Sequence, residues 1–117
     1  MISKFELASH VIGILVSEDI TSKNIDEIHL LIREGLSEQK QINLFVKIKS
    51  DCKISAAALL KDLEFKIQYA SKFNKMAIVT EIKWFRKLMS VKELFVDADI
   101  RTFKHAERLD AMNWISE

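Results

Sequence analysis

Short apolar runs alternate along the chain with longer segments whose apolar residues recur at helical spacing. Residues 11–16 (Val-Ile-Gly-Ile-Leu-Val) form a continuous apolar run, which is typical of a strand buried on both faces. Phe5 and Leu7 indicate a preceding strand, which can pair with this run through the short Ala8-Ser9-His10 connection. Further strands are expected over residues 42–48 and 76–79, and a weaker last strand within Leu94 to Phe103.

Four segments between and after these runs are expected to be helical. The first follows a cap at Thr21 or Ser22, and its spacing predicts a buried stripe of Ile25, Ile28, Ile32 and Leu36. The second follows a cap at Ser55 and extends to about Lys72, with an expected core face of Leu60, Leu63, Ile67 and Ala70. The third covers about Glu81 to Glu93. The fourth covers about His105 to Ile115, and its expected inward residues are Ala106, Leu109, Met112 and Trp114 or Ile115.

This order of elements predicts one α/β domain over residues 1–117. Strands joined by single helices form βαβ units with right-handed crossovers, and such units build a largely parallel sheet. A hairpin at the start would add an antiparallel strand. We therefore expect a mixed, mostly parallel sheet of about 4–5 strands with about four helices.

Composition is that of an ordinary folded domain. Of 117 residues, 49% are apolar and 30% are charged, which argues against disorder. The formal net charge of +1 gives no overall field that would attract nucleic acid, so no nucleic-acid partner is expected. The single Cys52 cannot form an internal disulfide, and no apolar run is long enough for a membrane span or a signal peptide. A cytoplasmic location is the expectation.

Catalytic and metal-binding constellations are not apparent in the sequence. His10, His29 and His105 are far apart and lack neighbouring ligands at metal-site spacing, so surface or boundary positions are expected for them. Cys52 precedes Lys53, a basic neighbour that favours the thiolate, but no histidine is near it in sequence. The acidic residues near strand ends are also what turns and caps use. We therefore predict no enzyme activity, no metal and no cofactor.

One basic stretch exceeds this background. Residues 72–92 contain six basic residues and a single acidic residue, Glu81. Within it, the predicted third helix combines Lys83, Arg86 and Lys87 with the apolar residues Ile82, Trp84, Phe85, Leu88, Met89 and Val91. Tryptophan beside basic residues is typical of a helix that lies on an anionic membrane or closes over an apolar ligand. The alternative is a core helix with a solvated basic edge.

An aromatic pair on the second helix is the other candidate surface. Phe65 and Tyr69 are four residues apart, so they are neighbours on one helix face. By helical geometry this face points away from the predicted core face around Leu60. Exposed paired aromatics indicate a partner surface, and packing at the boundary of the core is the alternative.

Several short strings resemble a known family. They are residues 72–79 (Lys-Phe-Asn-Lys-Met-Ala-Ile-Val) followed by Trp84, residues 98–103 (Ala-Asp-Ile-Arg-Thr-Phe) and residues 111–115 (Ala-Met-Asn-Trp-Ile). In this order the chain resembles the SpoIIAA-like proteins of bacteria, which are grouped with STAS domains and distantly with the CRAL-TRIO lipid-transfer fold. The resemblance covers nearly the whole chain. It implies a sheet with helices packed on it, a homodimer, and a link to membranes or apolar ligands.

The same resemblance makes Ser55 a candidate phosphorylation site. STAS antagonists of anti-sigma factors are phosphorylated on a serine before their second helix, in an Asp-Ser-Ser/Thr-Gly context. Here the stretch reads Ser50-Asp51-Cys52-Lys53-Ile54-Ser55-Ala56, with Cys52 in place of the first serine and no glycine. A helix N-terminus favours a phosphate at Ser55, but capping alone also explains this residue.

These observations predict a non-enzymatic binding protein. Its apolar contacts to a ligand or membrane would be Trp84, Phe85, Leu88 and Met89, and its contacts to anionic groups would be Lys83, Arg86 and Lys87. It would be cytoplasmic, peripheral at the inner membrane face. The alternative is a regulatory protein–protein module of the anti-sigma-factor-antagonist type. An enzyme would require a cleft with a strongly perturbed carboxylate or histidine.

Overall fold

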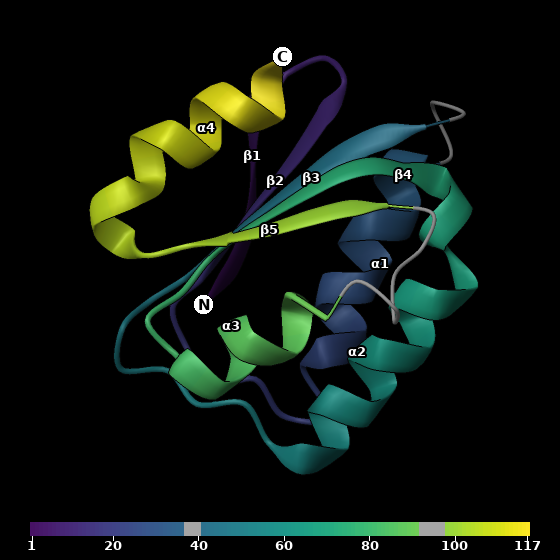
Figure 1. Cartoon of the computed structure of the whole chain (residues 1–117). Coiled ribbons are helices and arrows are strands. Elements are labelled where there is room, and N and C mark those ends of the chain that lie inside the picture. The colour runs from purple at the N-terminus through teal and green to yellow at the C-terminus, as the bar shows by residue number, and fades with distance from the viewer. Residues whose placement is uncertain (37–40, 92–97) are drawn as a thin grey trace.

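A computed structural model of the chain describes residues 1–36, 41–91 and 98–117. Within these residues the chain forms five strands, four α-helices and two short 3₁₀ helices (Figure 1). In chain order they are β1 (Ile2–Ala8), β2 (Val11–Val16), α1 (Ile25–Leu36), β3 (Ile42–Ile48), α2 (Ala56–Gln68), η1 (Ala70–Lys72), β4 (Phe73–Val79), α3 (Lys83–Met89), β5 (Asp99–Phe103), η3 (His105–Glu107) and α4 (Arg108–Ser116).

The sheet is mixed and mostly parallel, as the sequence predicts. Its strand order is β1-β2-β3-β4-β5, in which β1 pairs with β2 antiparallel and the other neighbours pair in parallel. Because each crossover moves to the next strand in the same direction, right-handed connections place α1, α2 and α3 on one face. Helix α4 follows the last strand and covers the opposite face (Figure 1).

Two apolar clusters lie on the two faces of this sheet. The larger cluster joins the crossover helices to the strands and includes the predicted stripe of α1, in which Ile25, Ile28 and Ile32 are buried. The smaller cluster lies under α4, with Phe45 and Ile115 both fully buried. Strand β3 contributes to both clusters, which explains its nearly continuous apolar sequence.

Helix α1 packs closely against β2 because of Gly35. A Cβ atom at this position would lie 2.7 Å from Cγ1 of the buried Ile12, which is closer than real Cβ contacts allow. Glycine therefore sets the distance between helix and sheet at this end of α1, at the cost of a weaker helix-forming residue.

The predicted core face of α2 is only partly confirmed: Leu63 packs half-buried against the core and Ala70 is buried in η1. Leu60 and Ile67 are 64% and 62% exposed, whereas Ala58 and Phe65 are buried. At about 100° per residue, the helix is turned by about a third of a revolution from the expected orientation, so the Phe65 and Tyr69 face lies inward. A bulky aromatic ring has more apolar area to bury than a leucine, which favours this orientation. The expectation of an exposed aromatic pair is therefore wrong for Phe65, and Tyr69 is half-buried against the core.

The last two helices also differ from prediction. Helix α3 has only seven residues, Lys83–Met89; the predicted extension to Lys92 and Glu93, and residues 94–97 of the predicted last strand, lie outside the described residues. In α4 the buried residues are Ala111 and Ile115, whereas Leu109 is 65% exposed. The predicted inward face is therefore confirmed for Ile115, and Met112 and Trp114 pack half-buried against the core. Ala106 and Leu109 are exposed because the 3₁₀ turn at His105–Glu107 shifts the phase of the following α-helix.

Candidate functional site

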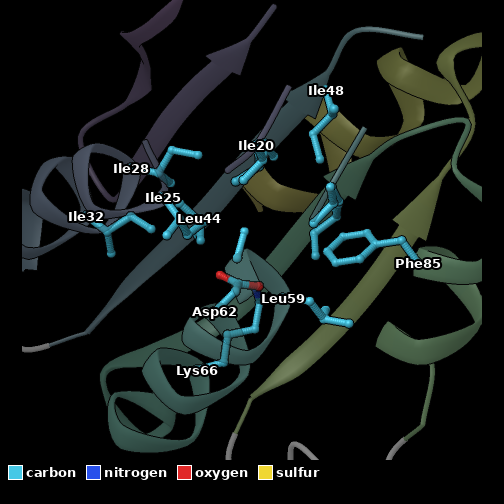
Figure 2. Close-up of a pocket in the computed structure, with 14 residues that line it drawn as sticks. Ile20, Ile25, Ile28, Ile32, Leu44, Ile48, Leu59, Asp62, Lys66 and Phe85 are labelled. Carbon is cyan, nitrogen blue, oxygen red and sulfur yellow. The ribbon is translucent and has the colours of Figure 1, made fainter. Parts of the chain in front are cut away.

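An apolar cavity lies between the sheet and the three crossover helices (Figure 2). The cavity and its openings to solvent together contain about 520 Å³ of space that no protein atom fills. The centre of a water-sized molecule can reach about 40 Å³ of space there. The 14 lining residues are mostly aliphatic: Ile20, Ile25, Ile28, Ile32, Leu44, Val46, Ile48, Ile54, Ala58, Leu59, Asp62, Lys66, Ile78 and Phe85. Such a cavity favours a slender apolar molecule, because its polar lining is confined to one place.

That polar place is an ion pair on α2. Lys66 donates a hydrogen bond to Oδ2 of Asp62, one helical turn earlier, and the two side chains are only 9% and 13% exposed. Figure 2 shows both side chains beside the aliphatic walls. The other carboxylate oxygen, Oδ1, lies 3.2 Å from Nε2 of His29 on α1. The pair therefore links the two helices as well as lining the cavity.

The electrostatics of this pair keep the Asp62 carboxyl ionised. Burial by itself would raise the pKa of the Asp62 carboxyl, but the Lys66 ammonium and the hydrogen bonds from Lys66 and His29 outweigh it. The pKa of Asp62 therefore lies below its ordinary value. Opposite charges next to each other make this end of the cavity polar without making it electrically charged.

His29 is not the boundary residue that the sequence predicts. It is 5% exposed, and its ring stacks on Phe65 with centroids 4.0 Å apart and planes 5° from parallel. Tyr69 follows, with its centroid 4.6 Å from that of Phe65. The aromatic pair expected at an interface thus belongs to the α1–α2 contact, where it holds His29 against Asp62.

The predicted contact residues of α3 point to two sides. Phe85 is 4% exposed and lines the cavity, and Met89 is buried in the core. Trp84 is 47% exposed, and Lys83 and Lys87 are exposed on the same outer side. The two remaining residues are less accessible: Leu88 packs half-buried against the core, and Arg86 donates to the main-chain oxygen of Thr80 at 2.8 Å.

Cys52 does not lie in the positive environment that its neighbour Lys53 suggested. The thiol is 5% exposed, and burial is the main cause that raises its pKa, with a further contribution from Asp51 and Asp19. The nearby Lys49 lowers the pKa by less. A buried, protonated thiol is a poor nucleophile, so Cys52 acts as a core residue.

Ser55 is exposed at the N-terminus of α2. Its hydroxyl accepts a hydrogen bond of 3.1 Å from the main-chain N–H of Ala58, so the predicted cap is confirmed.

His105 begins η3, with Nε2 2.7 Å from the main-chain oxygen of Ile48 and Nδ1 3.0 Å from the hydroxyl of Ser50. Both contacts tie η3 to the end of β3. No group of three metal-ligating side chains occurs within the described part of the chain.

Sequence reasoning missed the polar residues of the cavity lining, although it had named Phe85 as a ligand contact. Asp62 and Lys66 have helical pair spacing, which on its own suggests only a surface ion pair. His29 lies 33 residues before Asp62, and nothing in the sequence indicates that their side chains are in contact. The signal available was the run of alanines after Ser55, because Ala58 leaves space where α2 approaches the sheet.

Comparison with known proteins agrees with this architecture. The sequence profile of the SpoIIAA-like family matches residues 11–116. The chain belongs to the SpoIIAA-like family. Among solved structures, it is similar to an uncharacterised protein of the DUF3478 family with a SpoIIAA-like fold from Shewanella loihica PV-4. That match has a TM-score of 0.70 and 17% identity, and it covers 98% of this chain and 92% of the other.

The resemblance predicted from the sequence is therefore confirmed for family and fold. At 17% identity the structural match carries the fold alone. No curated protein matches the chain significantly. Within the described residues, no helix of this SpoIIAA-like domain is both long and apolar enough to cross a membrane.

Proposed function

We propose that this SpoIIAA-like domain is a non-enzymatic binding module that takes a small apolar molecule into the cavity between its sheet and crossover helices. The observation that carries the proposal is the lining itself, which comes from α1, α2, α3, β3, β4 and the segments that carry Ile20 and Ile54, and is apolar except for one ion pair. An apolar molecule in this space would remove its own surface from water while meeting side chains that are already buried.

The size of the cavity limits the ligand. Space for the centre of a water-sized molecule amounts to about 40 Å³, which holds a few water-sized groups and no more. Anything larger requires the walls to move apart. Helix α3 is the wall best suited to move, because it has seven residues and reaches the cavity through Phe85.

A cavity-filling substitution tests the proposal. Ala58 is fully buried and lines the cavity, so Ala58→Leu would occupy the space with a side chain. Ala57→Leu is the matched control, because Ala57 is the preceding residue of the same helix and is exposed. Benzene is a compact neutral probe but is larger than the open space, so it enters only as the walls move apart. We expect it to bind the wild type and Ala57→Leu but not Ala58→Leu. Equal binding by all three proteins would place the probe outside the cavity and refute the proposal.

The outer side of α3 supports a second part of the function, contact with an anionic membrane. Trp84 is 47% exposed and lies between exposed Lys83 and Lys87, a combination suited to the interface of anionic lipid and water. Its burial in lipid would leave the inward Phe85 free to respond to a ligand. The proposed location is accordingly cytoplasmic, peripheral at the inner membrane face.

Vesicle co-sedimentation tests this contact. We expect binding to vesicles containing phosphatidylglycerol, weaker binding to phosphatidylcholine vesicles, and loss of the difference in Lys83→Glu/Lys87→Glu. The control Lys4→Glu/Lys23→Glu changes the net charge equally at two exposed lysines of β1 and of the segment before α1. If both double variants weaken binding equally, general charge rather than α3 is responsible.

The regulatory protein–protein module remains the second candidate function, supported by the exposed Ser55 at the start of α2. A phosphate there would meet the free N–H groups of the first helical turn. Mass spectrometry of the protein from its native host tests this candidate. Phosphate on Ser55 would support it, and an unmodified Ser55 under all growth conditions would count against it.

A further inference from the structure

The ion pair at the cavity has hydrogen-bonding capacity to spare. An ammonium group has three N–H donors, and among the described residues the buried Lys66 uses one of them, for Asp62. Both oxygens of Asp62 are already engaged, one by Lys66 and the other by His29. The polar end of the cavity therefore offers unused donors on Lys66, whereas each oxygen of Asp62 already has a partner within the protein.

We infer that the cavity selects neutral apolar molecules that carry one oxygen acceptor, such as ketones, esters or alcohols, over carboxylates and amines of the same size. This inference rests on the proposed function, since it names the class of ligand for the same cavity. A carbonyl oxygen can accept a hydrogen bond from Lys66 without bringing a charge into the cavity. The bond would offset the cost of leaving that donor unpaired.

Charged ligands are excluded by the same pair. A carboxylate that reaches Lys66 also lies next to Asp62, and an amine that reaches Asp62 lies next to Lys66. At exposures of 9% and 13%, neither repulsion is screened well by solvent. Because the pair has no net charge, it cannot compensate a charge that the ligand would have to bury.

His29 holds this arrangement in place. Its Nε2 lies 3.2 Å from Asp62, and the stack on Phe65 fixes the ring plane. The carboxylate therefore cannot turn toward a ligand without losing its contact with α1. The donors of Lys66 are then the groups through which a ligand would be recognised.

A ligand series on the unmodified protein tests the inference. Seven isoleucines line the cavity, and their ¹³C-labelled methyl groups report binding by NMR, with Ile115 of α4, on the other face of the sheet, as an internal control. We expect hexanone and hexanol to shift the cavity methyls with a Kd at least about tenfold lower than hexanoate or hexylamine. If hexanoate or hexylamine binds as tightly as hexanone, and Ala58→Leu abolishes that binding, the selectivity inference is overturned while the proposed function stands. If no member of the series shifts these methyls, the proposed function fails as well.

A specificity change provides an independent test. Asp62→Asn keeps the shape of the side chain and removes the negative charge, which leaves Lys66 as an uncompensated cation. We expect hexanoate then to bind at least about tenfold more tightly than it binds the wild type, relative to hexanone. An unchanged ratio would overturn the assignment of Lys66 and Asp62 as the selecting groups. The wild-type series decides the question even if this variant does not fold.

Discussion

The substitution Lys66→Met examines the buried ion pair most sharply. Methionine fills most of the space of the lysine stem but leaves the Asp62 carboxylate without its main partner. Both side chains are mostly buried, at 9% and 13% exposure, so solvent cannot replace the lost interaction. Removing one partner of such a pair costs about 3–5 kcal/mol in the free energy of unfolding. That is a large share of the about 5–15 kcal/mol that stabilises a typical domain.

The double variant Lys66→Met/Asp62→Leu separates the charge effect from the loss of packing. With both charges replaced by apolar groups, no uncompensated charge stays in the interior, and most of the stability should return. Recovery will be incomplete because His29 loses the carboxylate that faces its Nε2. We expect a coupling energy between the two positions of at least about 2 kcal/mol.

Urea unfolding followed by circular dichroism measures these quantities for the wild type, both single variants and the double variant. Equal m-values across the four proteins would show that the same two-state transition is being compared. If Lys66→Met costs less than about 1 kcal/mol, the pair behaves as a surface salt bridge, and the reasoning about a buried ion pair at the cavity is refuted.

Further predictions concern single groups. The stabilisation from Asp62 is complete above the pKa of an unfolded aspartate and is lost as the pH falls through its lowered folded-state pKa. In urea unfolding at decreasing pH, Asp62→Asn should therefore lose less free energy of unfolding than the wild type. Ser55→Ala should cost about 1 kcal/mol in thermal unfolding, and Ser55→Asp should restore most of it, because aspartate also caps the first turn. Cys52 should react with a thiol reagent such as DTNB only slowly at neutral pH and rapidly in denaturant, and fast labelling of the folded protein would contradict its burial. In urea unfolding, Gly35→Ala should lower the free energy of unfolding by about 1 kcal/mol or more despite the better helix propensity of alanine. A gain in stability would show that the Ile12 side chain moves aside easily.

Strands and the face of α1 could be predicted because their local patterns allow one solution. The run Val11–Val16 suits only a central strand, and the stripe of Ile25, Ile28 and Ile32 gives α1 a single apolar face. Helix α2 has two. Its Leu60 and Ile67 side is as apolar as its Phe65 side, so spacing alone cannot decide which faces the sheet. The stack of Phe65 on His29 decides it, and that contact exists only once α1 and α2 are side by side.

The cavity could not be predicted for a similar reason. It depends on how closely α1, α2 and α3 approach β3 and β4, and a single small side chain, Ala58, changes that distance. The prediction for α3 was only partly right for the same reason, because it depends on packing. Its basic, tryptophan-bearing sequence was recognisable, but only packing shows that Phe85 points inward while Trp84 stays 47% exposed.

The central claim is that the cavity binds an apolar molecule, and one measurement tests it most directly. The isoleucine methyl spectrum of the wild type is recorded with increasing benzene and compared with that of Ala58→Leu. The account predicts saturable shifts at the cavity isoleucines, none at Ile115, and none in Ala58→Leu. Absence of saturable shifts in the wild type, or equal shifts in Ala58→Leu, would contradict it.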